Sequence, residues 1–375
     1  MRKKFTDCVD IVGKSCENFE GTKFYISTGA VDEDDINEYG IETINFEEKP
    51  SRANLIVKSD DIIFAKMQAT KKTLLINEEF AEYVYSTGFC AVHAKKNILT
   101  RDCLLYLLMS EAFLNQKDKN CSGATQKAIT NAGLQKIIVN IPDYKLQDDI
   151  SKKLSILLKV ISMRQNELDM LEDLIKARFV EMFGDPATNP MRWSETTIGD
   201  ECFYIKDGPH KSLPDIGKEN GGHPFISVRN IVNGYIDFST ARYISDEDYA
   251  NAIKKCHPEK GDMLYSKGGT TGIAKLIDID EEFANWVHVA VLKFDKSKLN
   301  GIFFENMLNG DYCFEQSQRL TKGIANRDLV LSAMAQIKMY RPPMEIQKQF
   351  ADFVNQVDKS KLYKISTLQF PCIPG

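Results

Sequence analysis

The two halves of the chain resemble each other at an offset of about 200 residues. The matched stretches, in order, are FYIST (24–28) with PFISV (224–228), KSDDIIFAKMQ (58–68) with EKGDMLYSKGG (259–269), INEEFAEYV (76–84) with IDEEFANWV (279–287), CSGATQKAI (121–129) with TKGIANRDL (321–329), and VNIPDYKLQDDI (139–150) with MYRPPMEIQKQF (339–350). Several matches in one order at nearly one offset indicate a tandem duplication. Because the repeating unit is half the chain, each copy is a whole domain and not one turn of a solenoid.

Each copy mixes strand and helix signals. Short runs such as TLLIN, DIIFAKM and VHVAVLKF are rich in β-branched and aromatic residues and predict strands. Residues 100–116 and 301–319 have helical spacing of their apolar residues, and the second of these helices is interrupted at Gly310. We therefore predict an α+β fold, with one globular domain at 1–143 and a second at 185–343.

A long helix is predicted between the two domains, over residues 144–184. The stretch from Gln147 onward has no glycine or proline until Gly184, which ends the helix. Some 40 residues at 1.5 Å each would make a helix about 60 Å long. Its apolar residues recur in steps of four and three, as in a coiled-coil seam: Ile150, Leu154, Leu157, Ile161, Leu168, Leu171 and Ile175.

The second copy starts a similar helix after Pro342 and Pro343, within residues 344–375. The seam residues of this helix are Phe350, Val354, Val357 and Ile365. We predict that the two helices pair as an antiparallel coiled coil; the alternative is that each packs only on its own domain. The second helix is the shorter, because the chain runs into Pro371. We expect this to leave the end of the first helix, around Phe179 to Phe183, without its partner.

Composition bounds the class of protein. The net charge is −5, so any nucleic-acid binding must rely on local basic patches. The nine cysteines include no CxxC pair and are interpreted as free thiols. There is no run of 18 apolar residues and no signal-peptide pattern at the start. We predict a cytoplasmic protein with no membrane contact.

The order of these segments resembles the specificity subunit of type I restriction–modification systems. The resemblance covers nearly the whole chain and is most specific in KARFVEMFGDP (176–186) and in the two Pro-to-Gln segments that lead into the helices. It implies two target recognition domains, each reading one half of a split sequence in double-stranded DNA. It also implies that the helices act as a spacer and dock modification (methyltransferase) subunits, to which restriction (translocase) subunits are added. S-adenosylmethionine, ATP and Mg would then belong to those partners, with no cofactor in this chain.

The expected geometry agrees with that function. An antiparallel helix pair would invert one domain relative to the other and give the chain an approximate two-fold axis. Duplex DNA has local two-fold axes, so such a chain could present equivalent surfaces to two separated half-sites. The helix would then set the length of the gap between them.

Candidate DNA contacts are polar and basic residues on predicted loops and strand ends, where side chains could meet base edges or phosphates. In the first domain they are Ser27, Thr28, Lys66, Gln68, Thr70, Lys71, Gln126 and Lys127. In the second domain they are His210, Lys211, Ser227, Arg229, Asn230, Lys267, Thr270, Thr271, Lys322, Asn326 and Arg327. The two sets differ in chemistry, so the two half-sites should differ as well.

Each of these residues has a simpler interpretation as part of a solvated loop or turn. The GGTTG run (268–272) lacks the GK[ST] ending of a phosphate-binding loop, and the five histidines show no metal-ligand spacing. The sequence also lacks methyltransferase, Walker A and nuclease motifs, which predicts a chain that is not itself an enzyme. Two alternatives remain open: a coiled-coil scaffold whose repeats bind protein, and an enzyme whose motifs are not visible.

Overall fold

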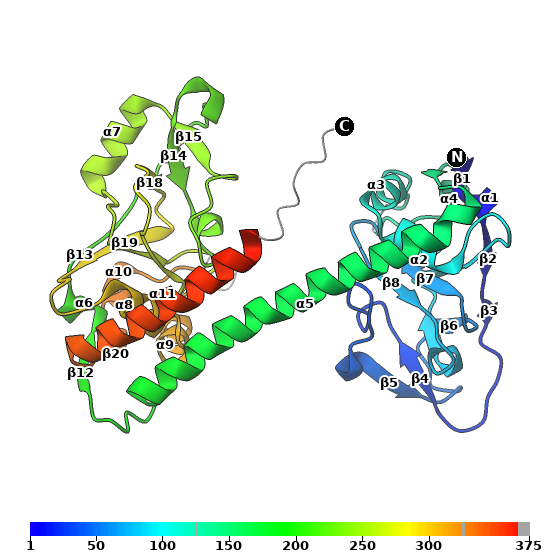
Figure 1. The fold of residues 1–375 in the computed structure, drawn as a ribbon, viewed down its shortest axis with the longest axis horizontal. Coiled ribbons are helices and arrows are strands. Elements are labelled where there is room, and N and C mark those ends of the chain that lie inside the picture. Colours follow the sequence, from blue (N-terminus) through cyan, green and yellow to red (C-terminus); the bar gives the residue numbers. More distant parts are fainter. Residues whose placement is uncertain (125, 324–326, 367–375) are drawn as a thin grey trace. The chain divides into compact units, whose positions relative to one another are not determined.

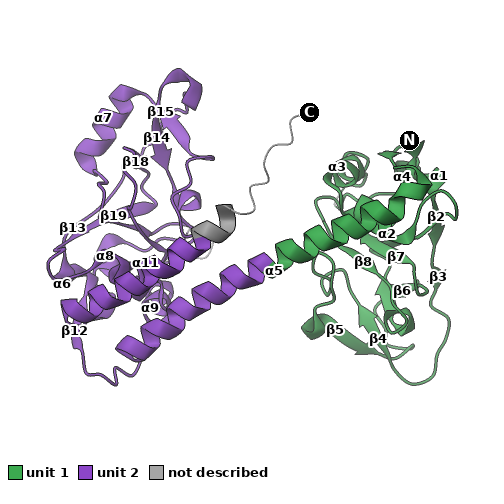
Figure 2. Cartoon of the chain, viewed as in Figure 1, with its two compact units in different colours: residues 1–163 green, residues 164–375 purple. Residues whose placement is uncertain are grey.

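A computed structural model describes residues 1–124, 126–323 and 327–366, with side chains up to residue 361. Residues 1–163 and 164–375 form two compact units (Figure 2). The division falls inside the long helix, which is one continuous element. Each unit contains sheets and helices, which confirms the predicted α+β class.

The first unit contains three small sheets with helices against them (Figure 1). Its elements are β1 (Arg2–Lys4), α1 (Phe5–Cys8), β2 (Val9–Val12), β3 (Lys14–Ser15), β4 (Lys23–Ile26), β5 (Ile41–Ile44), β6 (Ala53–Ile56), β7 (Ile62–Ala65), β8 (Thr73–Leu75), β9 (Val84–Ser86), β10 (Phe89–Ala94), α2 (Arg101–Met109), α3 (Glu111–Lys119), α4 (Asn131–Leu134), β11 (Ile138–Asn140) and the N-terminal half of α5 (Tyr144–Phe183), whose C-terminal half belongs to the second unit. The strand orders are β1-β11, β2-β10-β7-β8 and β3-β6-β9-β4-β5.

The second unit repeats this plan. Its elements are β12 (Ser194–Thr197), α6 (Ile198–Glu201), β13 (Cys202–Asp207), β14 (His223–Ile226), β15 (Arg242–Ile244), α7 (Asp246–Lys255), β16 (Met263–Ser266), β17 (Ala274–Leu276), β18 (Ala284–Asn285), β19 (Val289–Phe294), α8 (Gly301–Asn309), α9 (Asp311–Leu320), α10 (Leu331–Met334), β20 (Lys338–Arg341) and α11 (Met344–Ser366). The strand orders are β12-β20, β13-β19-β16-β17 and β15-β14-β18. The four-stranded sheets of the two units have equivalent strand order, as a duplication requires.

The repeated Pro-to-Gln segments are built identically. The Gln147 side chain is fully buried; its Oε1 accepts from Thr100 N at 2.8 Å, and its Nε2 donates to Ile98 O and Pro142 O at 3.0 and 3.2 Å. Gln347 makes the same three bonds, from Asn300 N at 2.8 Å and to Lys298 O and Pro342 O at 3.2 and 2.7 Å. Each amide thus ties the first turn of a long helix to the start of the domain's helical hairpin.

The EEFA match does not follow the structural register. The parallel pairs Tyr25 with Val84 and Phe225 with Ala284 make Val84 and Ala284 equivalent. The sequence match instead aligns Ala81 with Ala284. In the first unit EEFA runs into a 3-10 turn at Phe80–Glu82, whereas in the second it leads directly into β18. The matching letters therefore occupy different backbone positions.

The helix predicted at 100–116 is also divided, at the position that matches the predicted break at Gly310. Ser110 ends α2, and its side chain then accepts from Phe113 N to cap α3. Serine can end one helix and cap the next, so the break needs no glycine.

The second unit contains an antiparallel contact between the C-terminal half of α5 and α11 (Figure 1). The ring centroids of Phe183 and Phe350 are 5.5 Å apart, Arg178 Cζ lies 5.7 Å from the Phe353 ring, and Lys361 Nζ lies 3.9 Å from a Glu172 carboxylate oxygen. Positions descend along α5 as they ascend along α11, which fixes the direction. Predicted seam residues Ile175, Phe350, Val354 and Val357 are buried there, with Leu171 partly buried beside them.

Two predictions about this pair were wrong. Leu154, Leu157 and Ile161 are 38, 42 and 57% exposed, so the pairing does not extend along the whole predicted seam. Phe179 and Phe183 are well packed, because in an antiparallel pair the end of the first helix meets the start of the second. A short second helix therefore leaves the middle of α5 uncovered, and its end stays packed.

The remaining predicted seam residues are Ile150 and Leu168, both partly exposed, and Ile365, whose side chain lies outside the described residues. Helix α11 also packs on α8 of its own domain, as the Phe179, Phe303 and Phe350 cluster shows. Pairing with α5 and packing on the domain are thus both present in the second unit.

Candidate nucleic-acid interface

In the first domain the turn after β7 lies against a loop near the end of the domain. We call residues 66–72 the first strand-end turn and residues 121–124 and 126–129 the first companion loop. Gln68 N donates to Lys127 O and Ile129 N donates to Lys66 O, both at 2.9 Å. Lys72 Nζ also donates to Thr28 O at 2.8 Å. The fold therefore gathers predicted contact residues from three separate parts of the sequence.

A buried lysine supports the first strand-end turn from behind. Lys117 on α3 is only 1% exposed, and its Nζ donates to Met67 O at 3.0 Å and to Thr70 O at 2.7 Å. Its neighbour Asp118 accepts from Ala69 N at 3.1 Å. A buried ammonium is tolerated only when it is paired or hydrogen-bonded, and here it satisfies carbonyl groups of the turn. Lys117 was not predicted from the sequence, because a lysine in a helix is normally solvated.

The second domain builds the same pair of loops. We call residues 267–272 the second strand-end turn and residues 321–323 and 327–329 the second companion loop. Leu329 N donates to Lys267 O at 2.7 Å, and Gly269 N donates to Arg327 O at 3.1 Å. The glycines Gly123 and Gly323 both have positive φ, 135° and 84°, at matching positions of the companion loops. The repeated backbone bonds confirm that these loops are duplicated together.

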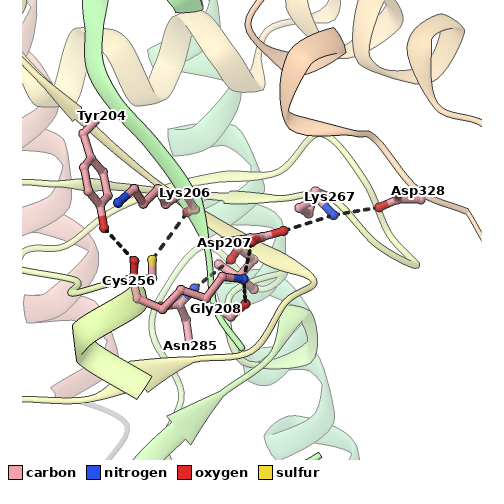
Figure 3. A network of polar contacts seen from close by, with 10 residues as sticks. Tyr204, Lys206, Asp207, Gly208, Cys256, Lys267, Asn285 and Asp328 are labelled. Atoms are coloured by element: carbon pink, nitrogen blue, oxygen red, sulfur yellow. Dashed lines mark hydrogen bonds and ion pairs between the residues drawn. The ribbon is translucent and has the colours of Figure 1, made fainter. Parts of the chain in front are cut away.

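Lys267 is held inside the protein. Its side chain is 7% exposed, and its Nζ lies 2.8 Å from Asp328 Oδ1 and 3.6 Å from Asp207 Oδ2 (Figure 3). Lys255 Nζ also contacts Asp207, at 2.8 Å. The predicted role of Lys267 as a DNA contact is wrong for this structure, because its charge is neutralised internally. Instead it joins β13 to the second companion loop.

Two more predicted contacts are buried. Asn230 is 1% exposed; its Oδ1 accepts from Ser227 N at 2.8 Å and its Nδ2 donates to Asp237 O at 2.9 Å. Thr271 is 1% exposed, with its carbonyl accepting from Gln318 Nε2 at 2.9 Å. Both shape loops and present no free group to a ligand. Arg229 beside Asn230 is exposed, and its Nη2 donates to Thr240 O at 2.6 Å.

The other predicted contacts divide by exposure. Exposed residues are Gln68, Lys71, Gln126, Lys127, His210, Lys211, Thr270, Lys322 and Arg327. Partly exposed residues are Ser27, Thr28, Lys66, Thr70 and Ser227. Asn326 lies outside the described residues. These groups remain predicted DNA contacts, and in each domain several of them lie on a strand-end turn and its companion loop.

Two further residues, Arg242 and Trp286, were not predicted from the sequence. The Arg242 guanidinium carbon lies 5.9 Å from the Trp286 ring centre, and its Nη1 donates to Ser212 Oγ at 3.2 Å. These residues line a hollow of about 190 Å³ together with Phe225, Ser227 and Arg229. Arg242 lies in a strand, RYI, and only the pairing of β14 with β15 brings it beside Phe225.

In the part of the chain that the structure describes, three or more His, Cys, Asp or Glu residues are nowhere grouped as a metal site would need. No helix within those residues has the length and apolarity to cross a membrane.

The duplicated halves of the chain both match a known family. The model of the family described as the type I restriction modification DNA specificity domain matches this chain twice, at residues 8–173 and 190–368. The chain belongs to this family. The resemblance inferred from the sequence is thereby confirmed, and recognition of DNA targets is the task of specificity domains.

Two proteins with sequences similar to this chain are named as specificity subunits. The specificity subunit of the type I restriction enzyme MjaVIII from Methanocaldococcus jannaschii is 21% identical over 327 residues, which cover 83% of this chain and 75% of that protein. The specificity subunit of the type I restriction enzyme HindI from Haemophilus influenzae is 25% identical over 163 residues, or 42% of this chain and 35% of that protein.

Solved structures show the same fold. The S subunit of a type I restriction–modification system from M. genitalium aligns with a TM-score of 0.56 at 14% identity, over 98% of this chain and 91% of that one. A chain from a study of complex assembly and conformational transition of the type I R-M system aligns with a TM-score of 0.51 at 17% identity, over 98% and 93%.

Proposed function

We propose that each domain reads one half of a bipartite, gapped target in double-stranded DNA, and that the chain carries no catalytic step of its own. The observation that carries this proposal is the pair of loops built twice. The same backbone bonds hold a strand-end turn against a companion loop in both domains, while the side chains on them differ. A repeated scaffold with altered surface chemistry suits two half-sites of different sequence.

The exposed lysines and arginines of these loops would supply phosphate contacts. With an overall charge of −5, the attraction must come from local groups such as Lys71, Lys127, Lys322 and Arg327. Neutralising phosphates releases counterions, so affinity should fall steeply with salt. Base discrimination then depends on neighbouring side chains that can meet base edges.

The long helix would set the gap between half-sites and dock modification subunits. Its apolar residues Leu154, Leu157 and Ile161 are exposed in this chain, which suits a helix that packs against another protein. In this proposal S-adenosylmethionine is bound by the modification subunits, and ATP and Mg by restriction subunits, in the cytoplasm. The same exposed residues would also suit a scaffold without DNA binding, which is the competing function.

Mapping of methylated adenines in cells tests the proposal. Cells that express modification subunits with this chain should methylate one bipartite target, and cells without the chain should not. Insertion of two helical turns near Arg164 adds about 11 Å and should lengthen the gap by about three base pairs. The substitution Arg164→Ala, without an insertion, is the control and should leave the gap unchanged. Methylation that does not depend on the chain, or an insertion that changes the recognised bases, would contradict the proposal.

A further inference from the structure

The hollow lined by Phe225, Ser227, Arg229, Arg242 and Trp286 has no chemical equivalent in the first domain. Strand register gives the matching positions. Phe225 pairs with Arg242 across β14 and β15, and Tyr25 pairs with Glu42 across β4 and β5. Arg242 is therefore replaced by a carboxylate in the first domain.

Trp286, which also lines the hollow, is replaced in the first domain as well. Because Ala284 and Val84 are equivalent, Trp286 corresponds to Ser86, two residues further along. The loop after each strand differs in the same sense, with Arg229 where the first domain has Gly29. The backbone frame is thus shared, while two guanidinium groups and an indole are present in one copy alone.

The hollow is lined by two guanidinium groups, and a guanidinium holds its N–H donors in one plane. An arginine has five N–H donors, and the described residues accept one hydrogen bond from Arg229 and one from Arg242. Trp286 lies against the Arg242 guanidinium, an arrangement that holds the planar fork in place. Phe225 adds an apolar wall.

An acidic group lies close to both arginines. Asp215 accepts backbone hydrogen bonds from Tyr243 N at 2.9 Å and Gly217 N at 3.1 Å. These bonds lower the pKa of Asp215 below its usual value, and the charges of Arg242 and Arg229 lower it further. Both bonds end on Asp215 Oδ1 and orient its loop, and among the described residues neither guanidinium forms an ion pair with Asp215.

The hollow is also connected to the second strand-end turn. The rings of Trp286 and His288 are in contact, with centroids 4.8 Å apart, and His288 O accepts from Lys267 N at 2.8 Å. The hollow is therefore adjacent to the second strand-end turn.

We propose that this hollow is a guanine-reading subsite of the second domain, in which Arg242, held against Trp286, donates to O6 and N7 of one guanine in the major groove. The inference rests on the proposed function and specifies one base that is read, a guanine, and the residue that reads it, Arg242. Arginine with guanine is the most frequent specific contact between proteins and DNA. The apolar surfaces of Phe225 and Trp286 beside the arginines suit a base edge better than a fully charged phosphate. The first domain, with Glu42 and Ser86 at these positions, would lack this preference.

The experiment uses the chain assembled with its modification subunits and compares methylated sites in cells that express the wild type, Arg242→Ala or Arg242→Lys. Both variants should lower the preference for guanine at one position of one half-site by about 5- to 150-fold, because neither has the bidentate fork. The other half-site and the gap should not change. Arg319→Ala removes an equal charge from an exposed position on α9 and should leave every position unchanged.

Three results would overturn the inference. They are a wild-type target with no guanine in the half-site that the second domain reads, no change in either arginine variant, and an equal loss of methylation at all target sequences, which is the signature of a phosphate contact. Thermal unfolding of the purified complexes separates a loss of contact from a loss of folding, since Arg242→Lys keeps the charge and the packing of the stem. If the wild-type chain directs no bipartite methylation at all, the proposed function has failed, and not only this subsite.

Discussion

The two strand-end turns share their backbone bonds but place their lysines differently. In the first domain Lys66 is partly exposed, and the buried ammonium is that of Lys117 behind the turn. In the second domain Lys267, equivalent to Lys66, is itself buried between Asp207 and Asp328, and Ser317 is found at the position of Lys117. The main-chain hydrogen bonds therefore define the loops in both domains. The buried lysine that stabilises them can come from α3, as Lys117, or from the turn itself, as Lys267, without a change in the backbone. This freedom is what two recognition surfaces on one frame require.

The largest expected effect comes from Lys267→Met. Removing one member of a buried ion pair strands the charge of its partner, and we expect a loss of about 3 kcal/mol in the stability of the second domain. The loss falls at the lower end for buried pairs because Lys255 still neutralises Asp207 and because the nearer partner, Asp328, is 46% exposed and can be solvated. Chemical denaturation measures it. Lys66→Met is the matched control and should cost less than about 1 kcal/mol, since Lys66 is partly exposed. Equal losses would contradict the different roles of the two lysines.

The next effect tests what the domains have in common. Gln147→Leu and Gln347→Leu each remove three hydrogen bonds from a buried amide. The backbone groups that lose their partner are an N–H and a C=O before the helical hairpin and one proline C=O before the long helix, which should cost about 1–3 kcal/mol in each domain. Thermal unfolding of the two variants should give similar losses. A large difference between them would mean that the two buried amides are not energetically equivalent.

The smallest effect concerns exposed charge. Lys127→Ala in the first companion loop and Lys322→Ala in the second should each weaken DNA binding by the assembled complex at all sequences. Each should also reduce the slope of log affinity against log salt by about one, as expected for the loss of one phosphate contact. Binding titrations at several salt concentrations measure this slope. Lys176→Ala, on the exposed face of α5, serves as the control and should leave the slope unchanged. A slope that stays constant in both loop variants would remove these lysines from the interface.

The fold could be predicted well where the signal was local or repeated. The uninterrupted run before Gly184 predicted the long helix, and Pro142 and Gln147 matched Pro342 and Gln347 because the same buried amide is needed twice. The extent of the helix pair was less predictable. It depends on which ends meet, and an antiparallel arrangement brings Phe183 to Phe350 and leaves Leu157 exposed.

The candidate site divides in the same way. Loop composition alone placed Lys71, Lys127 and Lys322 on exposed turns, because glycine-rich polar stretches lie at the surface. The same composition could not show that Lys267, Asn230 and Thr271 are buried and make their hydrogen bonds and ion pairs within the protein. Nor could it show that Arg242 and Trp286, more than 40 residues apart, line one hollow.

The sequence by itself determined the duplication, the class of fold and the long helix, since periodicity, turn residues and repeated motifs act over short distances along the chain. Only the tertiary structure decided which polar groups face inward, how far the helices pair, and which copy has the arginine hollow. Those outcomes depend on strand register and on partners distant in sequence. A register shift of a few residues puts the same amino acids, such as EEFA, at different structural positions in the two domains.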